Sequence, residues 1–167
     1  MEPALELVQL PSIAPDRTGR AKASASSRIC LMSLGGELFA VDLRQVREVF
    51  ELESVTPVPG MPAMLVGVAN LRGTVMPLAD LRPSLGVPSS GDQKYAVVVR
   101  HGSQQVGILI DTVPEIRTIH SDDLVSAASR GLAETRPFVS GLVKVEERMS
   151  SVMDVSKLLA CVEGTAV

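Results

Sequence analysis

The sequence predicts an all-β protein built from two similar small barrels that pack against each other. Short apolar stretches alternate with turn-forming residues along most of the chain, which is typical of β-sandwiches and barrels. A second series of such stretches repeats the first at a nearly constant spacing. Few segments have the spacing of apolar residues that an amphipathic helix requires.

The first predicted hairpin covers residues 28–43, where two apolar stretches flank Gly35-Gly36. Consecutive glycines suit the tight turn of a β-hairpin because both can adopt positive φ angles. In residues 104–110, Val106, Ile108 and Ile110 recur at every second position, as in a strand with one buried face. The other predicted strands are residues 63–71, 74–78, 95–100, 138–145 and 151–153.

Two short helices are expected, each beginning at an aspartate that can accept a hydrogen bond from the first turn. The first covers residues 80–85 and begins at Asp80, and Pro83 lies in its first turn, where proline is tolerated. The second is a C-terminal helix that begins at Asp154. Its apolar residues recur at i, i+3, i+4 and i+7, namely Val155, Leu158, Leu159 and Val162.

The repeat has a shift of 67 residues in its first part and 74 in its second. The first shift aligns residues 46–49 with 113–116, and the second aligns Gly67 with Gly141 and Asp80 with Asp154. The change of shift places additional residues of the second copy in the polar stretch 121–136. We expect copies at about residues 28–88 and 93–162, each near the lower limit for an independent core, with a groove at their junction. Chance similarity between apolar strands is the alternative.

Residues 1–27 are expected to form a flexible N-terminal tail, because prolines and an Ala/Ser-rich stretch interrupt any long period. The net charge of −3 and the 2% aromatic content argue against a nucleic-acid-binding protein. No apolar stretch approaches the roughly 20 residues of a transmembrane helix, and no signal peptide is recognisable, so we expect a cytoplasmic protein. Cys30 and Cys161 match no metal or redox motif and are expected to be buried thiols. No metal, cofactor or catalytic constellation is indicated.

Several motifs follow one another in a characteristic order. They are Val46-Arg47-Glu48-Val49, the proline-rich residues 56–62, Gly67-Val68-Ala69-Asn70-Leu71-Arg72-Gly73, Val75-Met76-Pro77-Leu78-Ala79-Asp80-Leu81-Arg82, residues 106–116, Phe138-Val139-Ser140-Gly141 and the helix at Asp154. In this order they resemble the CheW-like domains of chemotaxis coupling proteins. The resemblance covers about residues 28–162.

The resemblance implies two intertwined, five-stranded SH3-like barrels with short helices. It also implies a non-enzymatic adaptor that binds the cytoplasmic tip of a chemoreceptor and the regulatory domain of a CheA-type histidine kinase, and that pairs with other CheW-like domains in rings. Flagellar chemotaxis and type IV pilus twitching motility both remain open as outputs. A small β-barrel ligand-binding protein is the alternative from another functional class.

The resemblance also assigns candidate residues for coupling to the receptor or kinase, namely Glu48, Arg72, Val46, Val49, Asn70, Gly107 and Ile116. Glu48 and Arg72 are expected to form a salt bridge, although an ordinary surface ion pair would contribute only about 0–1 kcal/mol. The apolar positions could equally belong to the core, and Gly107 could mark a bulge or a close approach of another backbone. Residues expected to be structural are Gly67, Gly73, Pro77, Asp80, Gly141 and Asp154. Two departures from the family pattern fall in the second copy, namely Pro114 and Met149-Ser150-Ser151-Val152, where a more apolar strand is expected.

Overall fold

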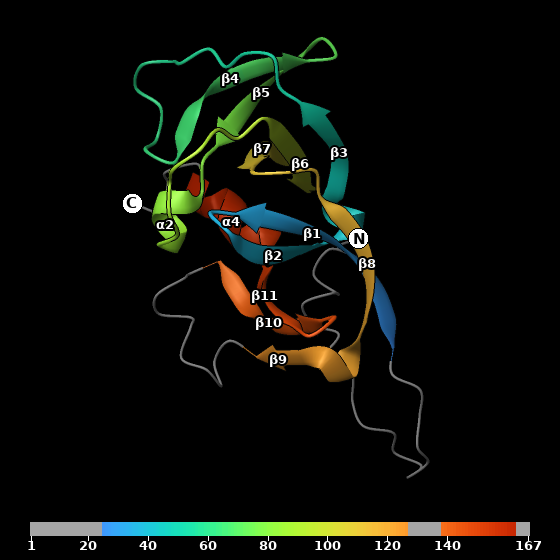
Figure 1. Cartoon of the computed structure of the whole chain (residues 1–167). Coiled ribbons are helices and arrows are strands. Elements are labelled where there is room, and N and C mark those ends of the chain that lie inside the picture. The colour runs from blue at the N-terminus through green and yellow to red at the C-terminus, as the bar shows by residue number, and fades with distance from the viewer. Residues whose placement is uncertain (1–24, 127–137, 163–167) are drawn as a thin grey trace.

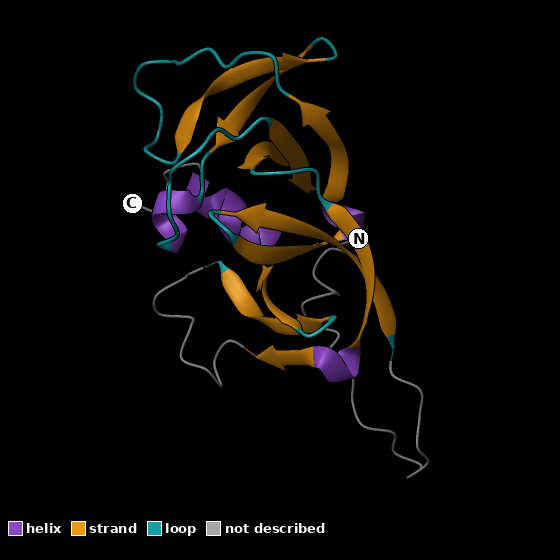
Figure 2. Cartoon of the chain, viewed as in Figure 1, coloured by secondary structure: helices purple, strands orange, loops and turns teal. Residues whose placement is uncertain are grey.

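The computed structural model describes residues 25–126 and 138–162, and these residues form the predicted all-β fold (Figures 1 and 2). The strands of the first half are β1 (Ser26–Leu34), β2 (Glu37–Asp42), β3 (Val46–Glu51), β4 (Leu65–Leu71) and β5 (Thr74–Ala79). Those of the second half are β6 (Tyr95–His101), β7 (Gln104–Ile110), β8 (Glu115–His120), β9 (Leu124–Ser126), β10 (Val139–Val145) and β11 (Arg148–Met153). The helices are the 3-10 turns η2 (Leu43–Gln45) and η3 (Ser121–Asp123) and the α-helices α2 (Arg82–Leu85) and α4 (Val155–Val162).

The strands form two curled sheets, which confirms the prediction of two β-barrels. One sheet has the order β3-β6-β7-β5-β4 and therefore the expected five strands. The other has six strands in the order β8-β1-β2-β11-β10-β9. Its sixth strand, β9, is only three residues long and pairs with β10 at the sheet edge.

The two sheets are intertwined because each half of the chain gives a hairpin to the sheet of the other half. The hairpin β1–β2 joins β8–β11 through a parallel pairing of β2 with β11. The hairpin β6–β7 joins β3–β5 through a parallel pairing of β7 with β5. Each sheet therefore contains strands from both repeat copies.

The pairing registers of the two sheets are related by the shifts of the sequence repeat. Glu48 of β3 lies opposite Val98 of β6, and 67 residues further on, Glu115 of β8 lies opposite Leu31 of β1. This agreement shows that the two halves have equivalent backbone pairings as well as similar sequences.

Gly67 and Gly141 follow the same irregularity of register, which occurs after Leu65 in β4 and after Val139 in β10. Gly67 has a φ angle of +156°, and a Cβ atom there would collide with the carbonyl oxygen of Thr56. That oxygen accepts a 2.8 Å hydrogen bond from the N–H of Val68. Glycine is required at position 67 because a neighbouring backbone lies directly against it.

The largest hydrophobic core lies between the two sheets and includes α4 (Figure 1). Its residues come from both halves, including Met32 and Phe39 from the first hairpin and Val97 and Val106 from the second. Two smaller hydrophobic clusters lie within the two curled sheets. One includes Ile29, Val143 and Val152, and the other includes Met76, Leu78 and Val98. The C-terminal helix agrees with the predicted apolar stripe, since its buried residues are Val155, Leu158, Leu159 and Val162.

The two predicted helix-starting aspartates differ in their geometry. Asp154 caps α4, since its Oδ1 accepts a hydrogen bond from the N–H of Lys157 at 3.2 Å. In α2 the cap position is occupied by Leu81, so the prediction that Asp80 is the N-cap is wrong by one residue. Asp80 instead accepts the N–H of Arg82 at 3.0 Å and forms an ion pair with its guanidinium.

Two segments differ from expectation, namely the predicted N-terminal tail and the strand that begins at Arg148. Ser26 and Ser27, assigned to the tail, begin β1 and pair with His120 and Ile119 of β8, while residues 1–24 lie outside the described residues. Residues 149–152, which are less apolar than the family pattern, belong to a regular strand, β11, in which the hydroxyl of Ser150 is buried without a hydrogen-bond partner among the described residues.

Candidate functional site

The turn between β4 and β5 consists of Arg72 and Gly73, both in the left-handed region with φ angles of +57° and +84°. Two consecutive positive φ angles characterise the type I′ turn, which matches the twist of the adjoining strands. The side chain of Asn70 accepts the N–H of Gly73 at 2.8 Å and so holds the turn. Gly73, which is expected to be structural, thus occupies a turn position that needs a positive φ angle, and Asn70 has a local structural contact while remaining exposed.

Arg72 reaches from this turn to β3, at the opposite edge of the same sheet. Its Nη1 lies 2.8 Å from Oε2 of Glu48, and its guanidinium lies 5.5 Å from the centre of the Phe50 ring. Glu48 and Phe50 are two residues apart and therefore share a face of β3. The predicted Glu48–Arg72 contact is present in the structure, and it links the two free edges of the curled sheet.

The pair is too exposed to matter greatly for folding. The Arg72 side chain is 74% exposed and that of Glu48 is 35% exposed, a setting in which an ion pair contributes about 0–1 kcal/mol. The two residues also line a shallow cavity of about 280 Å³ together with Arg47, Thr74 and Gln105. The arrangement leaves a planar guanidinium and a carboxylate accessible to a partner that supplies complementary polar groups.

Three of the four apolar candidates lie along the margin of the core between the sheets. Val49 pairs with the core residue Val97, and Ile116 pairs with the core residue Cys30. Cross-strand partners lie on the same face of a sheet, so Val49 and Ile116 extend this core to the surface, where they are 42% and 43% exposed. Val46 is half-buried and packs against the same core.

Gly107, the fourth, does not reach the surface. It is buried in β7, and a Cβ atom there would lie 2.8 Å from Cδ2 of Leu78. Its pairings with Val98 and Leu78 are regular, so the interpretation as a bulge is wrong and the close approach of a neighbour is what the structure contains. Gly107 can influence a partner only through the packing of this strand.

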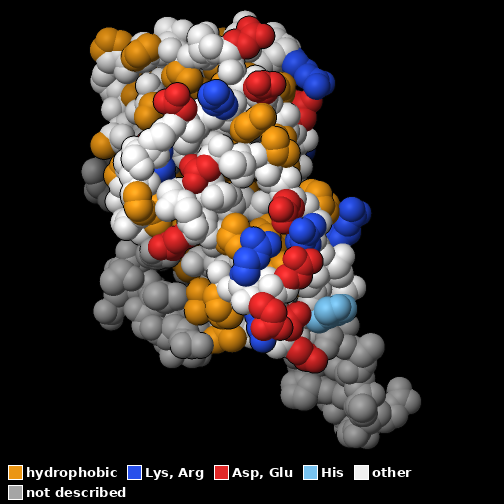
Figure 3. Space-filling model, viewed as in Figure 1, with side chains coloured by type: hydrophobic (Ala, Val, Ile, Leu, Met, Phe, Trp, Pro, Cys, Tyr) orange, Lys and Arg blue, Asp and Glu red, His pale blue; other side chains and the backbone are white. Residues whose placement is uncertain are grey.

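The second half has an equivalent turn with different chemistry, which sequence reasoning missed. Glu146 and Glu147, with φ angles of +49° and +68°, join β10 to β11. Nε of Arg117 on β8 lies 3.3 Å from Glu146, and its Nη2 lies 2.8 Å from Glu115. Figure 3 shows acidic and basic side chains close together over this region. The shift of 67 residues relates Phe50 to Arg117, and the shift of 74 relates Arg72 to Glu146. These two shifts of the sequence repeat could have revealed the contact between Arg117 and Glu146.

The remaining structural candidates lie within the sheets. Pro77 is half-buried in β5 and lies opposite Val68, and Gly141 is buried in β10. The thiol of Cys30 is buried, which raises its pKa to about 11, whereas Cys161 on α4 is only half-buried, contrary to expectation.

Two further observations concern metals and membranes. No group of three or more His, Cys, Asp or Glu side chains within residues 25–126 and 138–162 is arranged to hold a metal ion. None of the described helices is both long enough and apolar enough to cross a membrane.

Comparison with known proteins places this geometry in a family. The chain matches the CheW-like domain family over residues 28–163. The chemotaxis protein CheW of Bacillus subtilis is 26% identical over 141 residues, which cover 83% of this chain and 90% of that protein. Protein PilI of Pseudomonas aeruginosa is 29% identical over 116 residues, 68% of this chain and 65% of that protein.

A solved structure agrees with this assignment. The scaffolding protein TtCheW from Thermoanaerobacter tengcongensis superposes with a TM-score of 0.65 at 27% sequence identity, covering 77% of this chain and 89% of that one. The match of both sequence and fold extends over both sheets. The chain is therefore a member of the CheW-like domain family of chemotaxis scaffold proteins.

Proposed function

We propose that this protein is a non-enzymatic adaptor that couples the cytoplasmic tips of chemoreceptors to a CheA-type histidine kinase. The family membership carries this proposal, and the exposed Glu48–Arg72 pair supports it. An adaptor needs accessible groups whose contribution to its own folding is small. The pair meets this requirement, since the Arg72 side chain is exposed and that of Glu48 is partly exposed, and Arg72 lies in the turn of the β4–β5 hairpin.

The apolar margin formed by Val46, Val49 and Ile116 supports the same proposal. Exposed aliphatic side chains that continue a buried core suit the apolar face of a helical partner, such as a receptor tip. Binding two partners at once would raise the effective concentration of the kinase at the receptor without any chemical step.

The equivalent turns of the two halves support pairing with a second CheW-like domain, such as the kinase's regulatory domain. One turn carries Arg72 beside Glu48, and the other carries Glu146 and Glu147 beside Arg117. The two ends of the molecule therefore differ in the sign of their outermost charges. A partner domain with the same fold could contact one end without competing for the other.

The test is receptor-dependent kinase control in a reconstituted assembly of receptor, kinase and the full chain. We expect Glu48→Ala and Arg72→Ala to fold normally and to weaken kinase activation and array assembly. Arg100→Ala, which removes an exposed charge from β6, is the matched control and should leave both readouts unchanged. Normal kinase control and assembly by both site variants would refute the role of the pair.

The match to protein PilI leaves room for a second version of the same function in a non-flagellar system, for which we propose type IV pilus twitching motility as the output. The two versions differ in the kinase and receptor that the adaptor binds. Affinity capture of the full chain from its own cells, followed by identification of the bound kinase, decides between them.

A further inference from the structure

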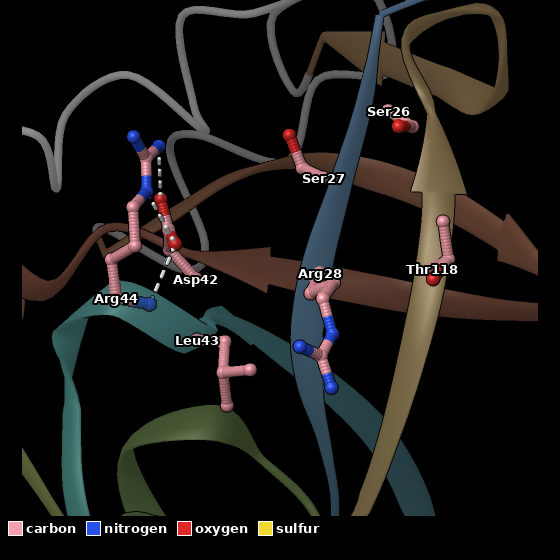
Figure 4. A pocket seen from close by; sticks show the side chains of 7 residues that line it. All are labelled: Ser26, Ser27, Arg28, Asp42, Leu43, Arg44 and Thr118. Carbon is pink, nitrogen blue, oxygen red and sulfur yellow. Dashed lines mark hydrogen bonds and ion pairs between the residues drawn. The ribbon is translucent and has the colours of Figure 1, made fainter.

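A wide hollow of about 740 Å³ lies beside the first strand, on the six-stranded sheet (Figure 4). Two neighbouring strands and the turn that leads out of β2 form its walls. Its lining residues among the described ones are Ser26, Ser27, Arg28, Asp42, Leu43, Arg44 and Thr118. The lining thus offers two guanidinium groups and three hydroxyl groups.

The only carboxylate among the described lining residues is already compensated. Asp42 is buried, and its two oxygens accept the backbone N–H, Nε and Nη2 of Arg44 at 2.9, 3.2 and 2.8 Å. Figure 4 shows these contacts as dashed lines from the Asp42 carboxylate to the guanidinium and the backbone nitrogen of Arg44. The pair is therefore close to neutral, and the described lining retains one net positive charge, that of Arg28.

Arg28 has no ion pair or hydrogen-bond partner for its side chain within the described part of the chain. It lies directly opposite Thr118 in the register of β1 with β8, so the two side chains share a face of the sheet. Ser26, two residues before Arg28, projects from the same face. An unpaired guanidinium is thus placed next to hydroxyl groups that can donate further hydrogen bonds.

We propose that this hollow is a binding site for a single oxyanion group, a carboxylate or a phosphate. The planar fork of Arg28 can donate two parallel hydrogen bonds to two oxygens of such a group, and Thr118 can donate a third. The hollow has room for the group and for the residue or molecule that carries it. The site is independent of the proposed coupling function, since it needs none of the residues assigned to that function.

The test is a titration of the full chain followed by two-dimensional ¹H–¹⁵N NMR. Sodium phosphate and sodium acetate are the two probes, and sodium chloride at matched ionic strength measures the general effect of salt. We expect saturable shifts, with a millimolar midpoint, of the amide signals of residues 26–28 and 118 for at least one probe. The probe that binds more tightly identifies the preferred anion.

Three variants separate the site from nonspecific attraction. Arg28→Gln should weaken binding about tenfold, and Thr118→Val, which keeps the side-chain shape, should weaken it about threefold. Arg100→Gln removes an exposed arginine elsewhere and should bind like the natural sequence. Shifts that rise linearly with concentration, that chloride reproduces, or that persist unchanged in both site variants would overturn the proposal. Amide spectra of each variant confirm that it is folded.

Discussion

Replacing Arg82 by methionine should destabilise the fold by about 2 kcal/mol at neutral pH. The side chains of Arg82 and Asp80 are only 10% and 17% exposed, and their closest atoms are 2.9 Å apart. Removing one partner of a fully buried pair costs about 3–5 kcal/mol, because the remaining charge stays desolvated. We expect roughly half of this loss of stability, because Asp80 is partly exposed and would still accept a hydrogen bond from the backbone N–H of residue 82.

The destabilisation should depend on pH in a defined direction. Burial alone would raise the pKa of Asp80, but the hydrogen bonds and charge of Arg82 outweigh it, so the pKa lies below its usual range. The stabilisation by the pair is therefore fully present above the unfolded pKa and is lost as the pH falls through the folded pKa. In Arg82→Met the burial remains and only the backbone N–H of residue 82 still opposes it, so the carboxylate becomes protonated at a higher pH than in the natural protein. The difference between the two proteins should narrow below about pH 4.

Urea unfolding at several pH values between about 3 and 7 measures this difference directly. At neutral pH we expect a melting temperature lower by roughly 4–8 °C. The double variant Asp80→Asn with Arg82→Met should be more stable than Arg82→Met alone, because it removes the uncompensated charge. Arg100→Met is the control for loss of an exposed cation and should change stability by no more than about 0.5 kcal/mol. A difference that stays constant across this pH range would show that lost packing, not charge, causes the effect.

Three further experiments test the packing. Gly67→Ala should lower the free energy of unfolding by more than about 2 kcal/mol, because its Cβ meets a backbone oxygen. Gly107→Ala should lower it by about 1 kcal/mol, because its Cβ meets a flexible side-chain end. Chemical denaturation compares the two variants, and equal losses of stability would contradict the geometry. Ser150→Ala should stabilise the fold by about 1 kcal/mol by removing a buried, unpaired hydroxyl, and a lower melting temperature would show that this hydroxyl has a partner. In the native protein Cys161 should react with a thiol reagent well before Cys30, which is fully buried with a pKa of about 11; simultaneous labelling would refute this order.

Local features of the fold could be predicted because their causes are local. Gly35-Gly36 marks the first hairpin, and the period of two in residues 104–110 marks a strand with an apolar face. Gly73 follows Arg72 between two strands, and only a left-handed turn joins strands so closely. The contact between Glu48 and Arg72 was expected from the family resemblance, because nothing local brings residues 24 positions apart together.

Features that depend on which strands become neighbours could not be predicted from local patterns. The network of Arg117 with Glu115 and Glu146 requires β8 to lie beside the β10–β11 hairpin. Likewise, the hollow at Arg28 exists because β1 pairs with β8 of the other half. Apolar periodicity gives the same pattern whichever copy supplies the neighbouring strand, so it cannot reveal the exchange of hairpins.

The exchange of hairpins has a consequence for an adaptor. Each sheet is completed by a hairpin of the other half, and the core between the sheets contains residues of both halves. Moving one sheet relative to the other would expose this core, at roughly 25 cal/mol for each Å² of apolar surface. The contact residues proposed on the two sheets therefore keep a fixed separation and orientation. A rigid spacing lowers the entropy lost when two partners bind together, so the interwoven fold itself favours simultaneous binding.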